Sequence, residues 1–193
     1  MKITYYGHSC FAAEINGKNL LFDPFITQNS LAKAIDIKKI KADYIFAGHS
    51  HADHIADIPF IAKRFGSKVI GSRTTTNIAL TAEVDKSQLV TIKGGEKLDF
   101  KEFSVQVIES QHGILTRNRQ KRQPKSEEVT KPWSGPIMGN AFVEGGRYLY
   151  YFTFGKHRVL HQSTGNFIEE NLKGLQPTSR SSPRTVITIG RRR

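Results

Sequence analysis

Three of the chain's seven histidines fall within six residues, in the stretch GHSHADH from Gly48 to His54. In an extended loop alternate residues point to the same side, so His49 and His51 can both reach one metal ion. Asp53 and His54 then face a neighbouring position. Imidazole together with carboxylate suits zinc, iron or manganese. The spacing therefore predicts a site for one or two metal ions; the alternative is a polar turn in which histidines happen to cluster.

The residues on either side of this stretch predict how it is held. The apolar run at 44–47 is typical of a strand in a buried sheet, and residues 58–65 have apolar side chains at helical spacing. A strand that ends at Gly48 places the loop at the edge of a sheet, which is a usual position for a functional site. Elsewhere, strand patterns joined by turns such as Asn16-Gly17 alternate with helical patterns. Together they indicate an α/β architecture with sheets covered by helices.

Length and composition limit the class of protein. With 193 residues, one domain over 1–193 is expected, and it is long enough to bury a core. The hydrophobic content of 38% and charged content of 24% exclude a disordered or membrane composition. Because Cys10 is the single cysteine and the N-terminus lacks a signal-peptide pattern, we expect a cytoplasmic protein without disulfides. We interpret Cys10 as a small buried side chain rather than a catalytic thiol.

The net charge of +12 is concentrated in two segments. Residues 116–136 predict a long basic loop without apolar periodicity, and residues 176–193 a basic tail with no acidic residue. Such charges could bind nucleic-acid phosphates. We favour a mobile, solvated surface instead, because aromatic residues other than Trp133 are not interleaved with the charges.

Three stretches, MKITYYGHSCF, LLFDPFIT and KADYIFAGHSHADHIAD, resemble a known family. They are similar to the opening of a small family of predicted metal-dependent hydrolases in the metallo-β-lactamase superfamily, and to L-ascorbate-6-phosphate lactonase. The H-x-H-x-D-H motif after an apolar strand carries the resemblance, which runs from residue 1 to about 113 and is weaker over 138–175. It implies an αββα sandwich of two mixed sheets flanked by helices.

The same resemblance implies roles for individual residues. His112 corresponds to the third histidine that binds one metal with His49 and His51. Asp53 and His54 correspond to ligands of a second metal, and Asp53 would also orient the attacking water and accept its proton.

Two further residues match the family around this site. Asp23 would lie beside the ligands and hold loop amides or a ligand histidine. For His8, in the turn Gly7-His8-Ser9, two interpretations stay open: a residue that lines the pocket, or a hydrogen-bonded structural histidine.

The second half departs from the family pattern. Ser163 stands where the family has a bridging aspartate, and a neutral serine is a poor metal ligand. The chain is also expected to stop before the family's last histidine, so that the second half is incomplete; His161 is either a substitute or a packing residue. We therefore expect one zinc ion per chain, with two ions as the alternative and manganese or iron as alternative metals. A sheet edge left uncovered would favour a homo-oligomer.

Three histidines and a water form the open arrangement of catalytic zinc. The sequence therefore predicts hydrolysis of a small-molecule substrate, namely an ester, lactone, amide or phosphodiester. Two alternatives remain: a nucleic-acid-binding nuclease of the same superfamily, and a degenerate, non-catalytic member that binds metal or a partner.

Overall fold

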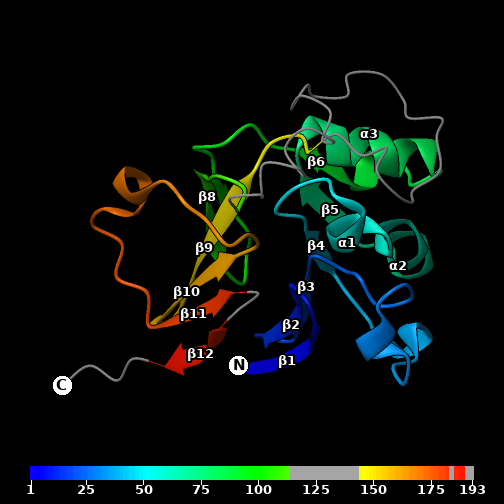
Figure 1. Cartoon of the computed structure of the whole chain (residues 1–193), viewed down its shortest axis with the longest axis horizontal. Coiled ribbons are helices and arrows are strands. Elements are labelled where there is room, and N and C mark those ends of the chain that lie inside the picture. Colours follow the sequence, from blue (N-terminus) through cyan, green and yellow to red (C-terminus); the bar gives the residue numbers. More distant parts are fainter. Residues whose placement is uncertain (114–143, 183–184, 190–193) are drawn as a thin grey trace.

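Two sheets pack face to face in the computed structural model, which describes residues 1–113, 144–182 and 185–189 (Figure 1). The first sheet follows chain order and consists of β1 (Lys2–Gly7), β2 (Cys10–Ile15), β3 (Lys18–Phe22), β4 (Tyr44–Phe46), β5 (Lys68–Gly71) and β6 (Leu89–Thr91). The second has the order β12-β11-β10-β9-β8-β7 and consists of β7 (Lys97–Asp99), β8 (Ser104–Glu109), β9 (Tyr148–Phe154), β10 (His157–Gln162), β11 (Ser179–Ser182) and β12 (Thr185–Ile189). Both sheets contain parallel and antiparallel pairs, which confirms the predicted sandwich of mixed sheets.

The first sheet changes from antiparallel to parallel pairing at β3. The β2–β3 hairpin closes at Asn16 and Gly17, whose φ angles of 48° and 78° are those that a two-residue hairpin turn requires. Parallel neighbours need crossover connections. These are supplied by α2 (Ile58–Phe65) between β4 and β5, and by α3 (Arg73–Thr81) between β5 and β6. The ends of β3, β4 and β5 therefore meet at one edge, where the loop after β4 emerges.

The α-helices cover the outer face of the first sheet (Figure 1). They are α2, α3 and the short α1 (Ala52–Ile55), and 3-10 turns η1 (Ser30–Ala32), η2 (Ile37–Lys39) and η3 (Lys86–Gln88) complete the connections. The outer face of the second sheet is covered instead by the segment containing the 3-10 helix η4 (Glu169–Leu172), which packs Phe167 and Leu175 near Leu160. None of the helices in the described ranges has the length and hydropathy that a membrane span requires.

An aromatic layer between the sheets holds the two halves together. The ring of Phe152 on β9 lies 5.0 Å from that of Phe46 and 5.2 Å from that of Phe22, centroid to centroid. Burying each such side chain contributes roughly 1.5–3 kcal/mol. The buried hydroxyl of Tyr150, also on β9, donates to the carbonyl oxygen of Ala47 at 2.6 Å. The second sheet thus bonds directly to the residue that precedes the histidine loop.

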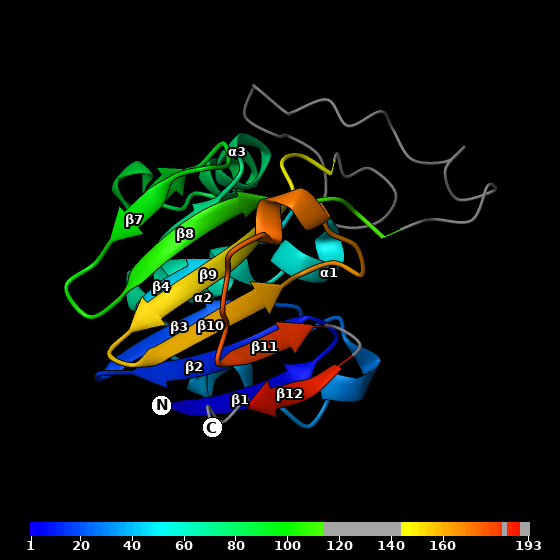
Figure 2. The ribbon, with the colours of Figure 1, turned by 90° about the vertical axis from the view of Figure 1, so that its left-hand side faces the viewer.

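The structure describes part of one of the two predicted basic segments and none of the other. The predicted loop at 116–136 lies outside the described residues. Within the predicted basic tail at 176–193, β11 pairs in parallel with β10 and antiparallel with β12 (Figure 2). The sequence of β11, SRSS, has no apolar alternation, so only pairing with its neighbours identifies it as a strand.

Candidate metal centre

The loop from Gly48 to His54 is clamped by both sheets. The Gly48 amide donates to Asp23 Oδ1 at 2.8 Å, and its carbonyl oxygen accepts from the Tyr148 amide at 2.8 Å. A Cβ at position 48 would lie 2.1 Å from Ser163 Cβ, so this close approach requires glycine. The loop then leads into α1, which begins just after His51 and includes His54.

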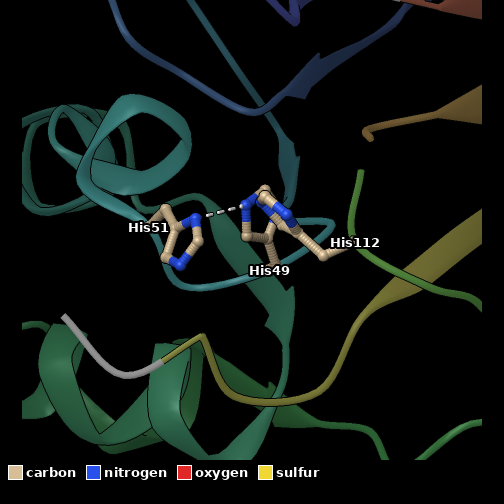
Figure 3. Close-up of side chains that lie close together, drawn as sticks. All are labelled: His49, His51 and His112. Carbon is tan, nitrogen blue, oxygen red and sulfur yellow. Dashed lines mark hydrogen bonds between the residues drawn. The ribbon is translucent and has the colours of Figure 1, made fainter. Parts of the chain in front are cut away.

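Three histidine side chains lie close together at this loop. The ligand atoms of His49, His51 and His112 all lie within 4.8 Å of one another, and we call them the first trio. His49 Nε2 and His51 Nδ1 are 3.0 Å apart, and the ring of His112 lies 5.1 Å and 4.9 Å from the other two (Figure 3). Nitrogens bound to one tetrahedral zinc are roughly 3.4 Å apart, from Zn–N bonds of about 2.1 Å. The donor set therefore fits a single ion.

Burial keeps two members of the first trio neutral. His49 is 1% exposed, and this burial, assisted by the neighbouring histidines, lowers its pKa well below the ordinary value. Burial also lowers the pKa of His51 to about 4, with His112 contributing. Neutral imidazole is the form that binds metal. At pH 7 these two rings present lone pairs without first having to release a proton.

A second group of ligand atoms lies beside the first. His8, Asp53 and His54 also place one donor each within 4.8 Å of one another, and we call them the second trio. His8 Nε2 is 2.9 Å from Asp53 Oδ2, and His54 Nε2 is 3.9 Å from the same oxygen. The rings of His49 and His54 are 3.9 Å apart, so the trios are adjacent. The structure thus brings His8 into the site, next to the carboxylate of the histidine motif.

A strained turn between β1 and β2 carries His8. Gly7 has a φ angle of 105° and His8 one of 54°, a left-handed conformation that costs a non-glycine residue on the order of 1–2 kcal/mol. The His8 carbonyl oxygen accepts from the Tyr5 hydroxyl at 3.0 Å, and Ser9 Oγ donates to the Ser163 carbonyl oxygen at 3.1 Å. The first contact holds the turn to β1, and the second joins it to the residue that follows β10 in the second sheet.

Asp23 connects the loop to both sheets from beneath the second trio. Its Oδ2 lies 3.0 Å from His161 Nε2 and 3.4 Å from His54 Nδ1, while Oδ1 holds the Gly48 amide. Complete burial alone would raise the pKa of Asp23, but the two histidines outweigh it and hold the pKa below its ordinary value. With its Nδ1 edge turned to Asp23, His54 directs Nε2 towards Asp53.

Ser163 and His161 lie behind the ligand groups rather than among them. Ser163 Oγ is 3.2 Å from His54 Nδ1 and 3.5 Å from His49 Nδ1, on the edges of both rings that face away from the trios. His161 is buried, with its ring 4.6 Å from that of Phe22 and its Nε2 on Asp23. Ser163 therefore contacts a histidine of each trio directly, whereas His161 contacts Asp23, which orients His54.

Sequence reasoning missed the buried carboxylate of Asp57. Asp57, which precedes α2, accepts from the Thr27 amide at 3.0 Å and also from the Ile26 amide and the Thr27 hydroxyl. It anchors the loop that follows Asp23. Its only signal in the sequence is its place in the acid-containing run after the histidine motif.

Burial raises the pKa of Cys10 to about 12, which is incompatible with a thiolate nucleophile at neutral pH.

Known proteins share this sequence pattern. A family model described as a beta-lactamase superfamily domain matches residues 2–170. The chain is 37% identical over 155 residues to a UPF0173 metal-dependent hydrolase of Methylacidiphilum infernorum, covering 79% of this chain and 61% of that protein. A protein of the same description from Flavobacterium johnsoniae is 47% identical over 77 residues, or 40% of this chain and 34% of that one. The chain thus spans less than two thirds of the length of these relatives.

Solved structures share the fold. An isothiocyanate hydrolase from Delia radicum gut bacteria is 13% identical with a TM-score of 0.61, over 92% of this chain and 68% of that one. A protein of Veillonella parvula, described as a possible metal-dependent hydrolase, is 14% identical with the same TM-score and coverage. At these identities the likeness establishes the fold alone.

Proposed function

The chain belongs to the beta-lactamase superfamily, whose model spans residues 2–170, and we propose that it is a metal-dependent hydrolase acting on a small-molecule ester, lactone or phosphodiester. The relatives that share its sequence are named metal-dependent hydrolases. The observation that carries the proposal is the convergence of three imidazoles, His49, His51 and His112, within 4.8 Å.

The first trio has the donors of a catalytic zinc position. Three imidazoles leave the fourth position of a tetrahedral ion open, and a zinc ion bound there lowers the pKa of water from about 15.7 to about 7. Since His49 and His51 are neutral at pH 7, they can serve as ligands there. We propose zinc, with manganese or iron as alternatives because imidazole also binds these metals.

Asp53 is the proposed general base. Burial would raise its pKa, but the hydrogen bond from His8 and the neighbouring His54 outweigh burial and hold the pKa below the ordinary value. Asp53 is therefore ionised at neutral pH and can accept a proton from water and pass it to the leaving group. Its side chain is 44% exposed, so a substrate can reach the carboxylate from solvent.

Metal analysis and hydrolysis assays on the same preparations test the proposal. The purified chain should retain zinc after dialysis and hydrolyse at least one substrate from a panel of esters, lactones and phosphodiesters. His49→Ala and His112→Ala should lose both properties. His157→Ala is the matched control, because His157 begins β10 and stacks on Phe154 at 5.3 Å, outside both trios. Wild-type hydrolysis by His49→Ala would contradict the proposal. A wild-type chain that binds zinc but hydrolyses nothing would support the non-catalytic alternative.

A further inference from the structure

We infer that His8 is a metal ligand, and that with Asp53 and His54 it completes a second ion position beside the first. This rests on the proposed function, because a second ion is useful only where the first is bound. The expectation of one ion per chain counted just Asp53 and His54 at the second position. The turn between β1 and β2 supplies the third donor.

The donor set of the second trio suits a divalent metal. It offers two imidazole nitrogens and one carboxylate oxygen, a combination found at zinc, iron and manganese sites. His8 Nε2 and Asp53 Oδ2 are 2.9 Å apart, and their side chains are 38% and 44% exposed, which leaves an open approach from solvent. An ion can therefore reach these two donors from solvent.

The orientation of His54 is set in advance. Its Nδ1 edge faces Asp23 Oδ2 at 3.4 Å and Ser163 Oγ at 3.2 Å, so its Nε2 edge faces Asp53 and His8. A hydrogen-bond partner on the far nitrogen is how proteins orient and tune a ligand histidine. Asp23 is fixed in turn by His161 at 3.0 Å.

The placement of His8 is not explained by the needs of the fold. Its imidazole meets Asp53 at one nitrogen and the rings of Phe25 and His54 edge-on, and its half-exposed position leaves no buried polar group to satisfy. The backbone nevertheless holds it at a φ of 54°. Strain of this kind at a residue that points into a cluster of ligand atoms indicates function.

The two positions should differ in their affinity for metal. His8 and Asp53 of the second trio are 38% and 44% exposed, and Asp53 is the single negative charge among the donors of both trios. Ser163 brings no charge to offset the repulsion between two dications. We therefore expect the first ion to bind at least about tenfold more tightly than the second.

The test is a zinc titration of the metal-free full chain by calorimetry, together with anomalous diffraction at the zinc edge. The wild type should take up two ions in two phases, with density at both trios. His8→Asn should lose the weaker phase and keep the tighter one. Asparagine is the substitution of choice because it tolerates positive φ, which preserves the turn. His157→Ala is the matched control and should keep both phases.

The outcomes separate this inference from the proposed function. A single ion at the first trio of the wild type, or two ions retained by His8→Asn, would overturn the role of His8 while leaving the hydrolase intact. Loss of both ions in His8→Asn with an unchanged thermal transition would also contradict it, because the first trio would then depend on His8. Failure of the wild type to bind any zinc would instead remove the proposed function itself.

Discussion

The first and second trios are assembled in different ways. His49 and His51 come from one loop, and a single residue from the end of the next sheet, His112, joins them. The second trio joins Asp53 and His54 to His8, which lies in a turn at the start of the chain. The motif thus supplies two members of each trio. The third comes from the second sheet in the first trio, and from the packing of the N-terminal hairpin on the histidine loop in the second.

They also differ in environment. The first trio is all imidazole, and burial lowers the pKa of His49 and His51. In the second, a hydrogen bond to Asp53 raises the pKa of His8 despite its partial burial. The first position is thus ready for metal at neutral pH, whereas the second must exchange a shared proton for an ion.

Gly48→Ala should have the largest effect, because it disturbs both trios at once. The added Cβ would lie 2.1 Å from Ser163 Cβ and 3.3 Å from the Tyr148 carbonyl oxygen, so the loop must move. Overpacking of this kind costs about 1–3 kcal/mol, and we expect loss of both zinc phases. Gly165→Ala is the matched control, since its Cβ meets nothing within 4 Å. Chemical denaturation and zinc titration measure the two effects. A Gly48→Ala chain with wild-type zinc binding would show that the close packing at Gly48 is not needed to form the two trios.

Asp23→Asn should weaken metal binding at the second trio more than at the first. An amide has one acceptor oxygen, so it cannot serve the Gly48 amide, His161 and His54 as the carboxylate does. Loss of a group that orients a ligand histidine typically reduces metal affinity about 10- to 100-fold. We expect that loss at the second position and a smaller one at the first, measured by competition with a chromophoric chelator. Asp99→Asn, at an exposed position on β7, is the control. Equal losses at both positions would mean that Asp23 supports the whole loop rather than His54.

The sequence predicted the parts of this site that depend on local spacing or on family resemblance. The H-x-H-x-D-H stretch identified four ligand candidates, and the resemblance to known hydrolases added His112 and the two-sheet fold. The contact of His8 with Asp53 joins residues 45 positions apart, and that of Asp23 with His161 spans 138. Such contacts follow from the packing of two sheets, so His8 could be interpreted in two ways and His161 was a candidate substitute ligand. The strand β11 was missed because its pairing with β10, rather than its composition, makes it a strand.

The pH dependence of zinc binding should distinguish the two positions. Because the pKa of His8 is raised above its ordinary value near 6.5, lowering the pH from 8 to 6 protonates His8 and weakens the second phase. The pKa of His51 is about 4 and that of His49 is also well below its ordinary value, so these two rings stay neutral and the first phase should change less. Calorimetry in buffers of different ionisation enthalpy should record more protons released in the second phase. Equal proton release in both phases would contradict the difference drawn between the trios.

Ser163→Ala should have the smallest effect. Its hydroxyl is neutral, and it contacts His54 Nδ1 and His49 Nδ1 at 3.2 Å and 3.5 Å, on the edges away from the ligand atoms. His54 keeps Asp23 as a partner on the same edge, so the loss is one ordinary hydrogen bond, worth about 0.5–1.5 kcal/mol. That corresponds to about a two- to tenfold weaker zinc affinity, visible in the same chelator competition. Ser104→Ala, at the opposite end of β8 from His112, is the control. A loss of both ions in Ser163→Ala would instead place Ser163 among the ligands, and the two positions would then share a residue rather than lie side by side as separate trios.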